Sequence, residues 1–216
     1  MVSCSVLEMK GFIFRLKACF YNHFKHITIV GGSNCSIRKL RLASCGKANR
    51  IMLGNHVRLN DVEIKIFGNG NIIHIDSNNT ITGIRLAMED DNNEIRIDSN
   101  TYIGAGSLLA ALEGTKITIG KDCMIAGPCE IRTSDSHSLT YIDGNRINPA
   151  KSISIGNHVW IGAGCMLLKG CFVPEDTIIA ARSLVTSTEG FVSNSLWGGS
   201  PAKLLKTGVN WKKERI

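Results

Sequence analysis

A branched aliphatic residue recurs at every sixth position between residues 155 and 185, and this period limits the folds that the chain can adopt. An amphipathic helix requires apolar residues three and four positions apart, and a half-buried strand requires alternation, so a period of six fits neither. It fits a parallel β-helix of hexapeptide repeats, in which three short strands and their turns form a triangular coil of about eighteen residues. We therefore predict an all-β fold. The aliphatic residues of this run are Ile155, Ile161, Leu167, Val173, Ile179 and Val185.

Shorter runs with the same period occur upstream, and their phase changes from one run to the next. They begin at Leu53, Ile97 and Ile119. The changes of phase predict loops near residues 60–75, 110–116 and 132–150, and long loops in a compact domain are usually functional or disordered. The last of these is polar and contains one histidine, His137. We expect a loop over about 133–150 to protrude from the β-helix and to carry chemistry.

Four of the eight cysteines occupy the fifth position of a hexapeptide, where a small side chain would fill the narrow space beside a corner of the coil. A buried thiol behaves there as a small hydrophobe. The chain has no Cys-x-x-Cys pair, and no secretory signal opens it. We therefore expect reduced cysteines, no metal site and a cytoplasmic protein. The four cysteines are Cys123, Cys129, Cys165 and Cys171.

The two ends of the chain depart from the repeat pattern. Within residues 5–25, apolar residues lie three and four positions apart, which predicts a short amphipathic helix. Such a helix either caps the open end of the β-helix, which we favour, or associates with an anionic membrane surface. We divide the chain into an N-terminal helical cap or arm (1–26), the parallel β-helix (27–196) and a C-terminal tail (197–216).

The formal net charge of +7 indicates anionic partners of some kind. The sequence contains no RNA-recognition, helix-turn-helix or zinc-finger pattern, and aromatic residues do not alternate with basic ones as a stacking surface for bases requires. We therefore expect no nucleic-acid partner. A phosphate-rich cofactor or an acidic glycan fits the charge at least as well.

The hexapeptides of residues 97–131 and 155–185, the His137 loop and the segment Trp197-Gly-Gly-Ser-Pro-Ala-Lys203 together resemble the left-handed β-helix acyltransferases. The strings Ile131-Arg-Thr-Ser-Asp-Ser-His137, Asp143-Gly-Asn-Arg-Ile-Asn148 and Ile155-Gly-Asn-His-Val-Trp160 are similar to those of bacterial polysaccharide O-acetyltransferases. The resemblance covers about residues 95–210. It implies a left-handed coil, a homotrimer, acetyl-CoA bound between adjacent subunits, and a carbohydrate acceptor.

The resemblance also implies roles for particular residues. His137 matches the base that removes the proton from the acceptor hydroxyl, a role that suits an imidazole because its pKa lies near 7. Trp160 matches a tryptophan near the thioester, where its indole N–H would stabilise the oxyanion; packing on a coil face is nearly as good an explanation. The matched contacts to acetyl-CoA are Trp160, Gly162, Ala163, Ala181, Thr186 and Lys203, and a solvated basic end is the alternative for the lysine.

Other polar residues near these motifs have simpler explanations. Asp135 either orients the imidazole of His137 or caps a turn, and we favour the turn. His158 and His56 hold equivalent positions in Gly-Asn-His-Val segments, so we expect both to be surface residues of the coil.

Three alternatives to an O-acetyltransferase remain open. The same fold and base would serve an N-acetyltransferase acting on a nucleotide-linked amino sugar. A carbonic anhydrase with hexapeptide repeats needs three histidines on zinc, and the spacing of the histidines here does not favour it. The third alternative is a non-catalytic β-solenoid that serves as a scaffold.

Overall fold

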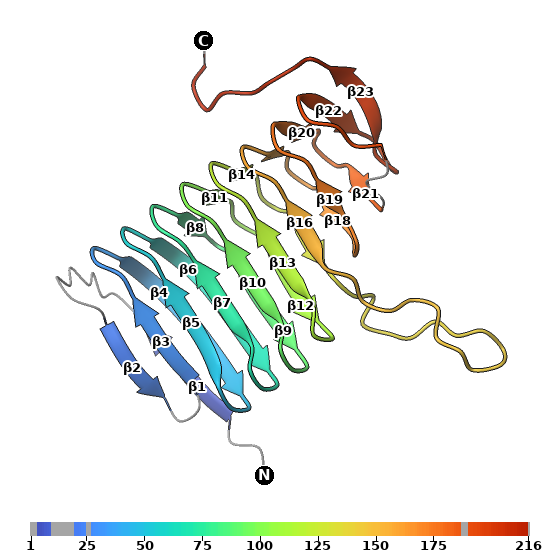
Figure 1. Cartoon of the computed structure of the whole chain (residues 1–216). Helices are drawn as coiled ribbons and strands as arrows, with labels where there is room; N and C mark the ends of the chain where they lie inside the picture. Colours follow the sequence, from blue (N-terminus) through green and yellow to red (C-terminus); the bar gives the residue numbers. More distant parts are fainter. Residues whose placement is uncertain (1–3, 10–19, 25–26, 187–189, 216) are drawn as a thin grey trace.

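The computed structural model describes residues 4–9, 20–24, 27–186 and 190–215, and the described chain is a stack of parallel strands (Figure 1). Most coils have three sides, and we name each side after one of its strands. No described residue belongs to a helix, so the described chain contains no helix able to cross a membrane.

The β7 side is a parallel sheet extended by one antiparallel strand, β2 (Phe20–Phe24), at its N-terminal edge. Its parallel strands are β3 (Ile27–Gly31), β5 (Asn49–Leu53), β7 (Ile72–Ile75), β10 (Glu94–Ile97), β13 (Lys116–Ile119), β16 (Ile153–Ile155) and β19 (Phe172–Val173).

The other two sides form one continuous sheet, because two long strands of the first coils, β4 (Ser36–Cys45) and β6 (Arg58–Phe67), run along both of them. The β8 side contains β8 (Thr80–Thr82), β11 (Tyr102–Ile103), β14 (Met124–Ile125), β17 (Trp160–Ile161), β20 (Thr177–Ile179) and β22 (Ser195–Gly198), to which β23 (Lys203–Thr207) adds antiparallel. The β9 side contains β9 (Arg85–Glu89), β12 (Leu108–Leu112), β15 (Glu130–Arg132), β18 (Met166–Leu167) and β21 (Leu184–Val185).

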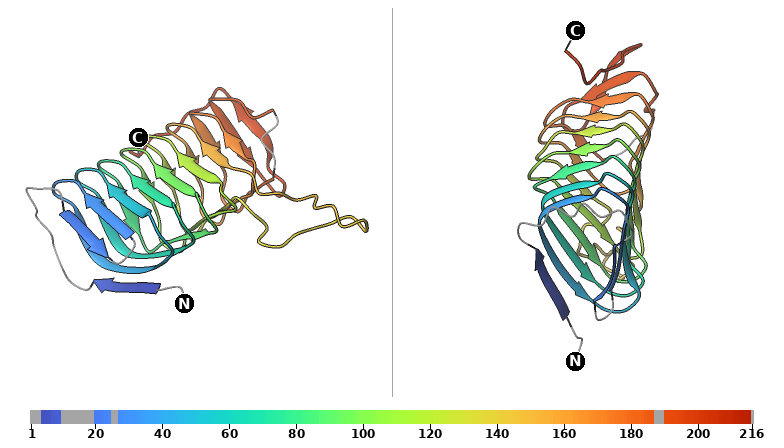
Figure 2. Two further views of the ribbon diagram at one scale, coloured as in Figure 1. Left: turned by 60° about the horizontal axis from the view of Figure 1, so that its bottom comes forward. Right: turned by 90° about the vertical axis from the view of Figure 1, so that its left-hand side faces the viewer.

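Three corners join the sides. The first corner leads from the β7 side to the β8 side, the second from the β8 side to the β9 side, and the third from the β9 side back to the β7 side. Figure 2 shows the stack from two further directions, with the segment after β15 extending away from it.

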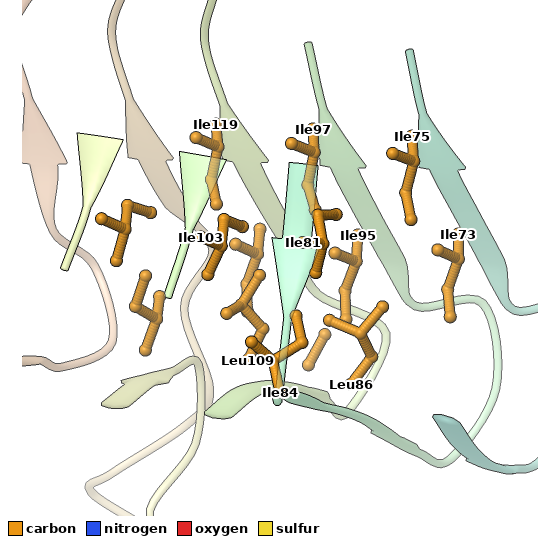
Figure 3. Packing of buried hydrophobic residues seen from close by; sticks show 14 of the residues in the cluster. Ile73, Ile75, Ile81, Ile84, Leu86, Ile95, Ile97, Ile103, Leu109 and Ile119 are labelled. Carbon is orange, nitrogen blue, oxygen red and sulfur yellow. The ribbon is translucent and has the colours of Figure 1, made fainter. Parts of the chain in front are cut away.

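The interior is a stack of aliphatic side chains; the residues of the six-residue period all point inward, and the longer strands of the β7 side, such as β7 and β10, each add a second one. Ile73 and Ile95 lie in register, as do Ile81 and Ile103, and all four are fully buried (Figure 3). Stacking like residues across parallel strands removes these side chains from water in every coil, and it fixes the register of the strands.

Small and polar residues fill the inner corners. At the third corner the side-chain oxygens of Asn49, Asn71 and Asn93 accept the backbone N–H of Asn71, Asn93 and Thr115, respectively. This ladder satisfies polar groups that would otherwise be buried without a partner.

The four predicted fifth-position cysteines are buried, and each thiol donates to a backbone carbonyl. Burial raises the pKa of Cys123 and of Cys171 to about 11. The expectation of reduced cysteines is wrong for Cys45, which is disulfide-bonded.

The helix predicted over residues 5–25 is wrong wherever the structure describes it. Residues 4–9 form strand β1 (Cys4–Met9), antiparallel to β4, and residues 20–24 form β2, antiparallel to β3. Residues 10–19 and 25 lie outside the described residues. An unpaired strand edge at the end of a β-helix presents free backbone N–H and C=O groups, and these two strands pair with such groups.

Two of the three predicted loops are also wrong. Residues 60–75 and 110–116 are ordinary strand–turn–strand segments, and only the third segment leaves the β-helix. The coils before it are longer than predicted: Ile73 pairs with Ile95, 22 residues away, whereas after it Ile161 pairs with Ile179, 18 residues away. The four extra residues lie around the third corner, where β12 and β13 have five and four residues but β18 and β19 have two each.

Candidate active site

Residues 133–150, which we call the arm, leave the β-helix after β15 at the third corner and return at β16 (Figure 1). The base of the arm is closed by backbone, since the N–H of Lys151 donates to the carbonyl of Thr133 over 3.0 Å. Thr133 is fully buried, and its hydroxyl lies 2.6 Å from the hydroxyl of Thr115, at the end of the asparagine ladder. The arm therefore starts from a rigid part of the core.

Asn148 ties the outgoing and returning strands of the arm together. Its side-chain amide donates to Asp135 Oδ2 at 2.7 Å and to the backbone carbonyl of His137 at 2.8 Å. Its side-chain oxygen accepts the backbone N–H of Leu139 at 2.7 Å. Because Asn148 is 7% exposed, these bonds are shielded from water, and they fix the backbone on both sides of His137.

Two ion pairs connect the arm base to the β-helix. Arg146 makes a bidentate pair with Glu113, with N–O distances of 2.6 and 3.0 Å. Lys169 Nζ lies 2.5 Å from Asp135 Oδ2 and also donates to the backbone carbonyl of Asn148 at 3.0 Å. The Arg146 guanidinium, followed by the Ser134 hydroxyl, lowers the pKa of Glu113 to about 2, and the Lys169 ammonium lowers the pKa of Asp135.

His137 is exposed on the arm, and its ring forms no hydrogen bond with any part of the chain that the structure describes. Asp135 does not orient this ring, because its carboxylate is taken by Lys169 and Asn148. Its role is to join the arm to the β-helix rather than to cap a turn. Ser136, just before the histidine, has a φ of 64°, a strained value of the kind that often accompanies functional sites.

The predicted donor contacts gather at the second corner. Trp160 points outward from β17 and is 38% exposed, whereas its neighbour Ile161 points into the core. Gly162 and Ala163 follow at the corner, and Ala181 occupies the same corner one coil later. Backbone hydrogen bonds join these two coils, from Gly162 N to the Ile179 carbonyl and from Arg182 N to the Ala163 carbonyl, both at 2.8 Å. The indole N–H of Trp160 has no acceptor among the described residues.

The coil itself explains why residue 162 is a glycine. A Cβ added there would lie 2.6 Å from the backbone nitrogen of Ala181, a contact that the stacked backbones could not accommodate without moving. Gly162 is therefore required by coil stacking whether or not a ligand passes over it. Ala163 and Ala181 are half-buried and exposed, respectively, so their small size does leave the surface of the corner open.

The two remaining predicted contacts differ in position. Lys203 is exposed at the start of β23 and pairs with Gly198, so it lies beyond the second corner at the C-terminal end of the stack. Thr186 is also exposed, but it follows β21 across the β9 side, away from that corner. The structure thus groups Trp160, Gly162, Ala163, Ala181 and Lys203, and it leaves Thr186 apart.

One chain does not bring His137 and Trp160 together. The arm starts at the third corner, and Trp160 lies on the β8 side, which is the side of the coil opposite that corner. Figure 1 shows the arm projecting outward from the stack rather than folding back over β14 and β20. The candidate site therefore consists of two separated parts, a base on the arm and a tryptophan beside the second corner.

Sequence reasoning missed the residues that hold the arm and the C-terminal tail. No spacing in the sequence connects Glu113, Lys169 and Arg146, because these residues meet only in the folded chain, at the third corner. Trp211 carries no sequence signal beyond being an aromatic residue among basic ones near the end of the tail; it is buried and stacks on His158.

The remaining histidines are scattered. His56 and His158 lie at the first corner with φ values of 58° and 53°, and His74 lies on the β7 side. Within the described ranges, no group of three or more histidine, cysteine or acidic side chains could hold a metal ion.

No family model matches the chain. The polysialic acid O-acetyltransferase of Neisseria meningitidis is 48% identical over 69 residues, 32% of this chain and 32% of that protein. The polysialic acid O-acetyltransferase of Escherichia coli O1:K1 / APEC is 34% identical over 112 residues, 51% of this chain and 36% of that protein. The matched part thus spans only about a third of the length of these curated relatives.

Solved structures extend the likeness over most of the fold. The polysialic acid O-acetyltransferase OatWY superposes with a TM-score of 0.72 and 27% identity over 90% of this chain and 93% of that one. The polySia-specific acetyltransferase NeuO gives a TM-score of 0.64 and 28% identity over 79% and 88% of the two chains. The chain is a left-handed parallel β-helix of hexapeptide repeats. Polysialic acid O-acetyltransferases are similar to this chain in both sequence and structure.

Proposed function

We propose that this protein transfers an acetyl group from acetyl-CoA to a hydroxyl group of a bacterial surface polysaccharide. The observation that carries the proposal is an exposed histidine on a rigidly anchored arm, in a fold whose relatives are polysialic acid O-acetyltransferases. A non-catalytic scaffold would not need a buried hydrogen-bond network that fixes the backbone around one exposed imidazole.

The chemistry follows from the residues at the two parts of the site. The imidazole of His137 accepts the proton of the acceptor hydroxyl as its oxygen attacks the thioester carbonyl. The carbonyl oxygen becomes an oxyanion, to which the free indole N–H of Trp160 donates. The oxyanion then collapses and the C–S bond breaks. The thiolate takes the proton from the imidazolium, so CoA leaves as a thiol and the acceptor as an acetyl ester.

The donor would lie along the second corner. Ala163 and Ala181 leave room beside Trp160 for the pantetheine arm, and Lys203, with Arg182, provides positive charge farther along for the phosphates. Thr186 would contact acetyl-CoA only if the pantetheine chain extended over the β9 side.

We infer that the protein is a homotrimer in which each site combines the arm of one chain with the second corner of another. The separation of His137 from Trp160 supports this arrangement. The arm also carries apolar side chains that a solvated loop does not need: Leu139, Tyr141 and Ile142 are exposed, the last completely. Exposed apolar residues that lie together are typical of protein–protein contacts.

The test of the reaction is release of CoA thiol from acetyl-CoA in the presence of acidic and neutral bacterial polysaccharides and nucleotide-linked amino sugars. We expect release that depends on a polysaccharide and disappears in His137→Ala, while Trp160→Ala lowers turnover less. Release with an amino-sugar nucleotide alone would instead indicate N-acetylation. Full activity in His137→Ala would remove the proposed base.

A further inference from the structure

The C-terminal tail runs back along the first corner of the β-helix. Val209 N donates to the Asn194 carbonyl at 3.1 Å, Trp211 Nε1 to the His158 carbonyl at 2.8 Å, and Lys213 Nζ to the Asn100 carbonyl at 3.2 Å. The three acceptors have φ values of 54°, 53° and 61°, because they occupy the same corner in different coils. The tail therefore descends from the last coil toward the middle of the stack.

Trp211 is the best fixed residue of this segment. It is only 5% exposed, and its ring stacks on the ring of His158 with a centroid distance of 4.6 Å and an interplanar angle of 12°. His158 Nδ1 in turn lies 2.8 Å from Asp176 Oδ1. One hydrogen bond and one stacked face thus hold the Trp211 indole, and the residue beneath it is itself held by the next coil.

Trp211 also lies beside Trp160. The two ring centroids are 6.1 Å apart and the rings are inclined by 44°, a separation within the range of favourable aromatic pairs. Trp160 is a partly exposed side chain on a two-residue strand, and such a side chain has several rotamers open to it. Trp211 occupies the space toward the first corner, so it removes the rotamers that would turn the indole that way.

We propose that Trp211 is a positioning residue that holds the Trp160 indole in its orientation and forms the first-corner wall of the acetyl-donor site. The inference rests on the proposed function, in which the Trp160 N–H stabilises the oxyanion. A hydrogen-bond donor contributes most when its orientation is fixed before charge develops. Small displacements of a catalytic group lower the rate steeply.

The competing explanation is that Trp211 only covers the first corner, and kinetics separate the two. We expect Trp211→Ala to lower kcat about tenfold while the KM for acetyl-CoA stays within about twofold. Trp211→Phe, which retains a stacking ring but loses the N–H, should recover part of the loss. The exposed neighbour Lys212 provides the control, since Lys212→Ala should match the wild type.

A double-mutant cycle gives the sharper result. In a Trp160→Phe background no indole N–H remains to be positioned, so adding Trp211→Ala should cause less than about a twofold further loss of kcat. Equal losses in both backgrounds, or an unchanged kcat in Trp211→Ala, would overturn the proposal. If the alanine variant does not fold, Trp211→Phe and His158→Ala replace it in the same cycle.

A readout independent of turnover keeps this proposal separate from the proposed function. Time-resolved fluorescence anisotropy in a Trp197→Phe background should show faster local motion of Trp160 in Trp211→Ala than in Trp211→Phe. Unchanged motion would contradict positioning even if the enzyme is active. If the wild type transfers no acetyl group, the proposed function is wrong. The anisotropy result then decides by itself whether Trp211 positions Trp160.

Discussion

Gly162 illustrates how a single residue in this fold meets two requirements. Its position beside Trp160 matches a donor contact of the acyltransferases, but the backbone of the next coil already excludes a side chain there. A small residue at this corner is thus weak evidence for a ligand. The exposed Ala181 is better evidence, because its side chain lies at the surface rather than inside the coil.

We predict that Gly162→Ala destabilises the whole β-helix by about 1–3 kcal/mol, the usual effect of overpacking. Chemical denaturation followed by circular dichroism measures it. Gly144→Ala is the control: residue 144 has a φ of 89° with nothing within 4 Å of an added Cβ, so its backbone strain should be confined to the arm. An equal shift of the denaturation midpoint in both variants would contradict the role of stacking.

The arm acts as one element because its base is linked to the β-helix at several points. Glu113 and Lys169 come from the β-helix, and Arg146, Asp135 and Asn148 come from the arm. Each carboxylate accepts from a cation and from a neutral donor, so both link the arm to the β-helix by charge-assisted hydrogen bonds. Such an anchor can hold His137 in place although the histidine itself has no hydrogen-bonded partner for its ring among the described residues.

The lowered pKa of Glu113 makes this anchor sensitive to acid. A carboxyl group whose pKa is lower in the folded state stabilises that state above its unfolded pKa. The contribution is lost as the pH falls through the folded pKa. For Glu113 the window runs from its ordinary value of 4.5 down to about 2. We predict that the melting temperature of the wild type falls across this window and that Glu113→Gln shows a smaller fall from a lower starting value.

Calorimetric scans between pH 6 and pH 2 test this prediction. Glu89→Gln is a control, since Glu89 is an exposed carboxyl group near the third corner that forms no ion pair among the described residues. If Glu113→Gln and the wild type lose stability in parallel, the ion pair with Arg146 does not contribute to the anchor.

At the scale of the whole molecule, the sequence predicted the interior better than the dimensions of the coil. The spacing of Ile155, Ile161 and Leu167 specifies which side chains point inward, because each is a core residue of a short strand. The same spacing predicts coils of about eighteen residues, and this is right only after the arm. Upstream, each coil has four more residues, which lengthen strands such as β12 and β13 around the third corner. In the sequence these extra residues shift the phase of the six-residue pattern, as an inserted loop would.

The errors at the N-terminus and at the site have a common cause. Residues 4–9 and 20–24 are strands because they pair with β4 and β3, and strand formation depends on such partners more than on local preference. Trp160 and His137 belong to recognisable motifs, yet no motif states that one chain keeps them apart. Contacts such as Lys169 with Asp135 join residues 34 positions apart, and periodicity carries no information about them.

The separation of the arm from the second corner is the central claim, and complementation between subunits tests it most directly. His137→Ala removes the base from the arm, and Ala181→Trp blocks the donor surface at the second corner of a chain whose arm is intact. Two differently tagged variants are mixed under refolding conditions, and oligomers that carry both tags are purified and assayed for thiol release.

Each variant alone should be inactive, and the mixed oligomers should regain about a third of the wild-type rate, because one of the three interfaces in any trimer that carries both variants pairs an intact arm with an intact second corner. Inactive mixed oligomers, formed under conditions in which refolded wild type is active, would show that both parts of the site must come from the same chain.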